Sequence, residues 1–310
     1  VPTTNEDGVH IGGIVGFLRS IGFAINMVRP TRTIIVFDGK GGSNRRRKIF
    51  PEYKAGRKMS LRLNRTDGIS LTRADEHKMM IAQLNRVIEY LELLPLTITT
   101  AENIEADDVI GYSAKHVFKD KVTIMSTDKD FLQLVDARIS VWSPTKKKMY
   151  DQEKILEEYG ISSTNFLLFR TMDGDKSDGI PGIKGAGIKT LLKLFPWLES
   201  PHKFTIEDVL KSAESKKKQF KLCEVITNSS DQLLLNKKLM DLDEINISGS
   251  SKLKIQEICG NPIQRLVKHI FQKKFLEDKL YTALPNLDSW LHTTFNRLNF
   301  MAEKTHGTKT

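Results

Sequence analysis

The spacing of apolar side chains changes along the chain between the period of a helix and that of a buried strand. Residues 9–29 place apolar side chains three or four positions apart, which predicts a helix with one apolar face: Ile11, Ile14, Val15, Leu18, Ile21 and Ile25. Residues 33–37 (TIIVF) form a short β-branched run, which is typical of a buried strand. Asp38 and Gly39 end this strand.

The same alternation continues to about residue 150. The pattern predicts helices at about 74–94 and 105–118, and Pro95 stops the first of them. It predicts further strands at 96–100, 122–127 and 138–142. Strands that alternate with helices indicate an α/β fold with a mostly parallel sheet and helices on its faces.

The strand signal fades after about residue 152. Residues 152–245 and 262–300 are predicted helices broken by Gly and Pro, and 246–254 (NISGSSKLK) is a predicted loop. The chain therefore divides into an α/β domain at 1–150 and a helical region at 151–310. The last residues, HGTKT, are expected to fray.

Residues 40–75 are basic and poor in apolar side chains, which predicts a mobile or partner-ordered segment. Its run of Arg45, Arg46, Arg47 and Lys48 has two interpretations, a solvated face or a phosphate-handling surface. Tyr53 lies beside Lys54 and near Arg57, and a cation next to an aromatic ring suits stacking on an unpaired base.

Composition narrows the range of partners. The 310 residues carry a net charge of +10, which suits a polyanion, although such a surplus also simply aids solubility. Two cysteines make no disulfide framework and indicate a reducing, cytoplasmic compartment. No apolar run approaches the ~20 residues that cross a bilayer, and no signal peptide is visible. The first residue is Val1, which suggests a truncated or processed product.

Carboxylates follow the predicted strands. Asp38 and Asp128 each come directly after a strand, and Asp130 lies two residues further on. Strand ends at one edge of an open α/β sheet are where ligands gather, so these acids are expected to converge. Glu105, Asp107 and Asp108 open a helix, where acids also serve as caps and complement the helix dipole. Three acids in four residues exceed what capping needs.

Residues 173–189 (DGDKSDGIPGIKGAGIK) add two further acids, Asp175 and Asp178, immediately before a glycine-spaced hairpin. Gly182, Gly185 and Gly187 allow backbone N–H groups to approach a phosphate closely. The alternative is an ordinary turn, because Asp and Gly are common turn residues.

The acids together predict a metal site that acts on phosphodiesters. Like charges in one pocket repel each other, and a divalent cation resolves the conflict. Oxygen-only ligands favour Mg²⁺ or Mn²⁺, and two such ions would hydrolyse a phosphodiester. The predicted ligands are Asp38, Glu105, Asp107, Asp108, Asp128, Asp130, Asp175 and Asp178.

Five motifs in this order resemble the flap endonuclease and 5′-nuclease superfamily, which includes the 5′-nuclease domain of bacterial DNA polymerase I and the exonucleases and ribonuclease H of bacteriophages. The motifs are VFDG, FPEYKAGR, EADD, STDKD and GDKSDGIPGIKGAGIKT. The resemblance implies a PIN-like nuclease domain joined to a helix–hairpin–helix module at about 173–195. It also implies that residues 43–75 form an arch that single-stranded 5′ ends pass.

The resemblance implies roles for individual residues. The eight acids match metal ligands of the family. Arg46, Tyr53, Lys54 and Arg57 match residues that position the scissile phosphate, with Lys54 or Arg46 offsetting its charge in catalysis. The hairpin would grip duplex DNA, with Lys184 and Lys189 on its phosphates and K⁺ as a further candidate ion.

The implied function is a structure-selective, Mg²⁺-dependent 5′-nuclease that removes RNA primers or flaps in replication or repair. Implied partners are DNA with a 5′ end or flap, RNA/DNA hybrids and replication proteins, with a monomeric, bacteriophage-type chain. One departure is the family's first metal aspartate, which lies on a strand before the first helix and has no counterpart here. Two alternatives therefore stay open, a nucleic-acid-binding protein without turnover and a ribonuclease of the broader PIN group.

Overall fold

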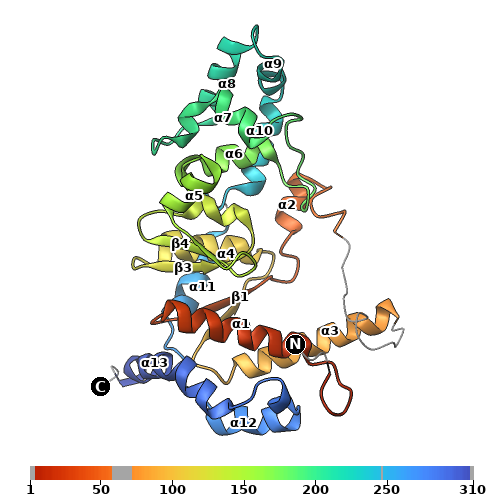
Figure 1. Ribbon diagram of the computed structural model, residues 1–310, viewed down its shortest axis with the longest axis vertical. Helices are drawn as coiled ribbons and strands as arrows, with labels where there is room; N and C mark the ends of the chain where they lie inside the picture. Colours follow the sequence, from red (N-terminus) through yellow and green to blue (C-terminus); the bar gives the residue numbers. More distant parts are fainter. Residues whose placement is uncertain (1–3, 58–71, 246, 308–310) are drawn as a thin grey trace. The chain divides into compact units, whose positions relative to one another are not determined.

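The computed structural model describes residues 4–57, 72–245 and 247–307 (Figure 1). The chain divides into two compact units, each built from separate segments. Unit 1 comprises Val1–Val36, Lys58–Thr99 and Glu257–Thr310, and unit 2 comprises Phe37–Arg57 and Thr100–Gln256. The sequence-based boundary at about residue 150 stays a prediction.

Unit 1 is mostly helical, with a two-stranded sheet of β1 and β2 at its border. Its elements are α1 (Gly12–Val28), β1 (Ile34–Phe37), α3 (Arg73–Leu91), β2 (Thr97–Thr100), α12 (Lys268–Glu277), the 3₁₀ turn η6 (Leu280–Thr282) and α13 (Leu287–Gly307).

The predicted first helix is confirmed as α1, and its glycines mark close packing. A side chain at Gly22 would lie 2.7 Å from the indole nitrogen of Trp290 on α13. The N–H of Gly13 donates to the amide oxygen of Gln83 on α3 at 2.8 Å. Small residues therefore let α1 approach both helices.

Unit 2 contains a three-stranded sheet surrounded by helices. Its first half has α2 (Asn44–Ile49), α4 (Ala106–Tyr112), the π-helical turn η2 (Ser113–Val117), β3 (Val122–Met125), the 3₁₀ turn η3 (Lys129–Leu134), β4 (Ile139–Ser143) and β5 (Lys148–Tyr150). Its second half has α5 (Gln152–Tyr159), η4 (Ser163–Asn165), α6 (Phe166–Asp173), α7 (Ile188–Leu194), η5 (Pro196–Glu199), α8 (Ile206–Lys216), α9 (Lys221–Asn228), α10 (Ser230–Met240) and most of α11 (Gly249–Gly260).

The sheet of unit 2 has one parallel and one antiparallel pairing. β3 and β4 run parallel, with Val122 opposite Ile139, and β4 and β5 run antiparallel, with Ser143 opposite Lys148. The α/β class predicted from the alternation is confirmed. β5 was not predicted, because its three residues, Lys148–Tyr150, are too few to show a period.

Two sequence-based predictions are wrong for described residues. Residues 40–57 are folded rather than mobile: α2 forms there, and Arg46 and Tyr53 are each only 3% exposed. Residues 58–71 of the same segment lie outside the described residues. From Gly249 onward, the predicted loop at 246–254 is the start of α11. The Ser248 hydroxyl accepts the N–H of Ser251 at 3.1 Å, and the backbone of Ser248 accepts that of Lys252.

In the part of the chain that the structure describes, no helix has the length and apolar character to span a lipid bilayer.

Candidate metal and nucleic-acid site

The eight predicted metal ligands all lie in unit 2, on four segments. Asp38 follows β1, the EADD acids open α4, Asp128 and Asp130 follow β3, and the last two acids lie in the loop after α6. The strand ends and helix starts therefore lie where the sequence predicts them.

At the start of α4, one acid caps the helix and another is held by ion pairs and hydrogen bonds. The Asp38 carboxylate accepts the N–H of Ala106, the first residue of α4, at 2.8 Å. Asp38 therefore satisfies one of the free N–H groups at this helix end. Glu105 stands at the N-cap position, yet its side chain is engaged by Arg46, Lys54 and Tyr53 instead.

Arg46 neutralises the buried acids of α4. Its guanidinium binds Asp108 through two nitrogens at 2.7 and 2.8 Å, and also Glu105 at 2.5 Å. Its Nε donates to the backbone oxygen of Leu239 at 2.7 Å. Asp108 is fully buried and receives a second guanidinium, that of Arg45, at 2.9 Å. Arg46 is itself buried, which favours a positioning role over contact with a substrate.

Tyr53 joins two of the acids. Its hydroxyl lies 3.0 Å from Glu105 and 3.1 Å from Asp178. Burial raises the pKa of this phenol far above its ordinary value, so it stays protonated and can donate. Lys54 pairs with Glu105 and lies 4.9 Å from the centre of the Tyr53 ring. Arg57 pairs with Asp178, so Lys54 and Arg57, like Arg46, contact acids in this structure.

Arg170 is a site residue that sequence reasoning missed. From α6 it donates to Asp130 at 2.6 Å, Asp175 at 2.8 Å and the backbone oxygen of Gly174 at 2.9 Å. Burial alone would raise the pKa of Asp175, but hydrogen bonds from Ser177 and the charge of Arg170 lower it on balance. The available signal was a cation one helical turn before Asp173 and five residues before Asp175.

Three of the eight acids form no ion pair within residues 4–57, 72–245 and 247–307: Asp38, Asp107 and Asp128. Burial, followed by the charge of Asp128, raises the pKa of Asp107 to about 7. Burial also raises the pKa of Asp130 to about 6, with Asp128 contributing in the same direction. Negative charge is therefore least compensated around Asp107 and Asp128.

The carboxylate oxygens of Asp107 and Asp128 are the kind of ligand that a hard divalent cation prefers. Among the described residues, no three His, Cys, Asp or Glu side chains are grouped so as to hold an ion. Mg²⁺ commonly takes only one or two protein carboxylates and fills its other positions with water and substrate phosphate. Burial and then the charge of Asp128 raise the pKa of Asp107, and a bound cation would offset both contributions.

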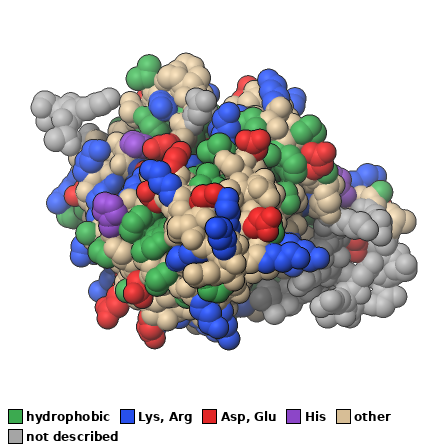
Figure 2. Space-filling model, turned by 90° about the horizontal axis from the view of Figure 1, so that it is seen from above, with side chains coloured by type: hydrophobic (Ala, Val, Ile, Leu, Met, Phe, Trp, Pro, Cys, Tyr) green, Lys and Arg blue, Asp and Glu red, His purple; other side chains and the backbone are tan. Residues whose placement is uncertain are grey.

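The glycine-spaced segment connects α6 to α7 and leaves its basic residues exposed. A side chain at Gly182 would lie 2.0 Å from the backbone oxygen of Asp173, so internal packing requires glycine at this position. Gly185 has a φ of +90°, which favours glycine on conformational grounds. The side chains of Lys184 and Lys189 are exposed, as are Gly185 and Gly187. Figure 2 shows Lys and Arg side chains scattered over one face, interleaved with acidic and apolar ones.

Comparison with known proteins agrees with this fold. Residues 1–160 match the family model described as the 5′-3′ exonuclease, N-terminal resolvase-like domain. A 5′-3′ exonuclease of Aquifex aeolicus is 28% identical over 286 residues, covering 90% of each chain. DNA polymerase I of Bacillus subtilis is 29% identical over 258 residues, which cover 79% of this chain and only 27% of the polymerase.

Among solved structures, the fold matches the bacteriophage T5 flap endonuclease, crystallised as a pseudo-enzyme–product complex with DNA and metal ions. The TM-score is 0.61 at 22% identity, and the match covers 86% of this chain and 90% of that one. The chain has the PIN-like fold of these nucleases. It belongs to the 5′-3′ exonuclease family.

We expect Arg46→Met to destabilise unit 2 by about 3–5 kcal/mol, because the fully buried Asp108 then keeps only the partly exposed Arg45, and the buried Glu105 loses one of its two cations. Urea unfolding measures the change. Lys48→Met, at an exposed position of the same helix, is the control and should change stability by less than about 0.5 kcal/mol. Equal effects of the two variants would contradict the neutralising role of Arg46.

The raised pKa of Asp107 predicts a pH-dependent stability. The folded state holds this proton up to about pH 7, whereas an unfolded Asp releases it near pH 4, so stability is lost as pH rises through that window. In EDTA, Asp107→Asn should melt several degrees above the unaltered protein at pH 8, and the gap should close near pH 4. Asp120→Asn, at an exposed position, is the control. A gap independent of pH would refute the prediction.

Proposed function

We propose that this chain is a structure-selective, Mg²⁺-dependent 5′-nuclease that hydrolyses phosphodiesters near a 5′ end or a single-strand/duplex junction. The observation behind the proposal is that the charges of Asp107 and Asp128 repel each other and neither carboxylate has an ion-pair partner among the described residues. Family membership supports the same reaction class. Removal of RNA primers or flaps is the proposed biological setting.

Asp107 and Asp128 are the residues that would hold the ion. When bound, Mg²⁺ would activate a water molecule and neutralise charge on the scissile phosphate. The chain's own residues have separate tasks. Arg46 fixes the carboxylates of Glu105 and Asp108, and Tyr53 holds Glu105 against Asp178.

Lys54 is the proposed phosphate ligand. Its side chain is 14% exposed and pairs with Glu105, while the guanidinium of Arg46 is 3% exposed. The ammonium group of Lys54 can exchange the carboxylate of Glu105 for a substrate phosphate. It would then offset the negative charge that develops on that phosphate during the reaction. Arg57, whose side chain is half exposed, would leave Asp178 and bind another phosphate of the substrate strand.

A second ion, as a two-metal mechanism requires, would use Asp130 and Asp175. Both carboxylates are bound by Arg170. We therefore propose that Arg170 holds these two carboxylates in position for the second ion. The proposed partner is DNA with a 5′ single-stranded end or flap.

Cleavage of a 5′-labelled flap substrate in Mg²⁺, with EDTA as the blank, tests the proposal. Asp128→Asn should abolish cleavage while flap binding in EDTA stays unchanged, because only the metal contact is lost. Asp120→Asn should retain both. Equal loss of cleavage and binding would count against a metal role.

The same assay separates the alternatives. Binding of the flap without any cleavage in Mg²⁺ or Mn²⁺ would favour a nucleic-acid-binding protein without turnover. Selective cutting of unstructured RNA would favour a PIN-type ribonuclease.

Exposed Lys189 should contact duplex phosphate. We expect Lys189→Ala to weaken duplex binding and to reduce the slope of log K against log salt by about 1, the value for one lost phosphate contact. Lys218→Ala, an equally exposed lysine of unit 2, should leave the slope unchanged. Fluorescence anisotropy across a salt series measures both, and an unaltered slope for Lys189→Ala would remove this contact from the proposal.

A further inference from the structure

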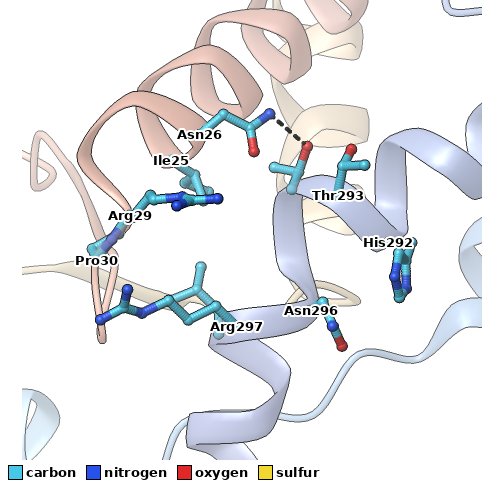
Figure 3. A pocket seen from close by; sticks show the side chains of 10 residues that line it. Ile25, Asn26, Arg29, Pro30, His292, Thr293, Asn296 and Arg297 are labelled. Atoms are coloured by element: carbon cyan, nitrogen blue, oxygen red, sulfur yellow. Dashed lines mark hydrogen bonds between the residues drawn. The ribbon is translucent and has the colours of Figure 1, made fainter.

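Unit 1 has a pocket of its own, between the C-terminal end of α1 and the middle of α13 (Figure 3). Its volume is about 380 Å³. The buried side chains of Ile25, Thr294 and Leu298 are part of its lining. The amide of Asn26 donates to the hydroxyl of Thr294 at 3.2 Å, which ties the two helices together beside the pocket.

Two arginines supply the charge of this pocket. Figure 3 shows the side chains of Arg29, at the end of α1, and Arg297, on α13, both bordering the pocket. Among the described residues, neither guanidinium has an ion pair or a side-chain hydrogen bond, and none of the lining residues is acidic. The two positive charges are therefore uncompensated.

The acids of α13 are engaged elsewhere. Asp288 pairs with Lys268 at 2.9 Å and accepts from Gln272 at 2.8 Å. Glu303 accepts from Asn299 at 3.0 Å. Neither acid is among the residues that line the pocket.

Helix capping accounts for only one of the arginines. Arg29 ends α1 in the left-handed conformation, with its N–H bonded to the oxygen of Ile25, and a cation there complements the helix dipole. Arg297 lies in the middle of the 21-residue α13, where the dipole gives no such benefit. The pairing of the two arginines across one concave surface needs a different reason.

We propose that this pocket binds the phosphate group of a nucleotide. Guanidinium groups bind phosphate oxygens in a two-point geometry and are the preferred cations for this purpose. The volume lies in the range of small-ligand sites, about 300–1,000 Å³, so it admits more than a bare phosphate. Thr293 and Asn296 line the same space and offer neutral polar groups for the attached sugar or base.

This phosphate site is lined by residues of unit 1 alone, shares none with the carboxylates of unit 2, and takes a ligand without metal. Two sources share the chemistry: a phosphate of a nucleic-acid strand and a free mononucleotide. Binding is measured in EDTA, where no cleavage occurs, so the outcome is independent of the proposed nuclease activity.

The test compares two double variants of the full chain with equal loss of charge. Arg29→Gln/Arg297→Gln removes the pocket cations. Arg265→Gln/Lys273→Gln removes two exposed cations of unit 1 that do not line the pocket. In the mononucleotide arm of the experiment, calorimetry measures the binding of dAMP and of inorganic phosphate. In the strand arm, fluorescence anisotropy measures the binding of a labelled single-stranded oligonucleotide across a salt series.

Loss of dAMP affinity by at least about tenfold in the pocket variant alone would assign the site to free nucleotides. A strand-binding salt slope reduced by about 1.4, twice the 0.7 expected per single-strand phosphate, and only in that variant, would assign it to strand phosphates. Asn296→Asp should reproduce either loss with both arginines kept, because it adds a negative charge to the lining of the pocket. Indistinguishable behaviour of the two double variants in both arms would overturn the proposal.

Discussion

The guanidinium of Arg46, buried between Asp108 and Glu105, is the interaction on which the site in unit 2 depends. A lone carboxylate as buried as Asp108 would be strongly destabilising or would take up a proton. Arg46 prevents this and also binds the backbone at Leu239, so one side chain joins α2, α4 and α10. Glu105 is held in the same contact, and its position in turn places the hydroxyl of Tyr53 and the ammonium of Lys54.

The acids of the site form two groups, those with a basic side chain as ion-pair partner and those without one. Arg46, Lys54, Arg57 and Arg170 reach carboxylates on other segments of unit 2 and pair with them. Asp107 and Asp128 have no such partner among the described residues, and burial, followed by the charge of Asp128, raises the pKa of Asp107. Functional sites often keep charged side chains without a partner in the protein, because a bound ligand or ion then offsets their charge.

The sequence predicts the elements well because their signals are local. The apolar spacing of α1 and the carboxylates after β1 and β3 can be read within a few residues. The partners of those carboxylates cannot, because they come from distant segments. Arg46 lies in a basic run typical of a solvated face, yet it is buried against an acid 62 positions away. Arg170 stands in an apolar stretch of α6 with acids shortly after it, but nothing local indicates its ion pair with Asp130, 40 positions away.

The glycine-rich loop between α6 and α7 has two structural roles. Its first part is closed on itself: the backbones of Asp175 and Ile180 exchange hydrogen bonds at 2.9 and 2.8 Å, and Gly182 packs against the backbone oxygen of Asp173. This closure directs Asp175 toward Arg170. Its second part presents Lys184 to solvent, and Lys189 is exposed in the first turn of α7. Gly182 lies between the acids and Lys184, and a side chain there would meet the backbone oxygen of Asp173 at 2.0 Å, so a substitution at Gly182 would disturb the backbone on which both depend.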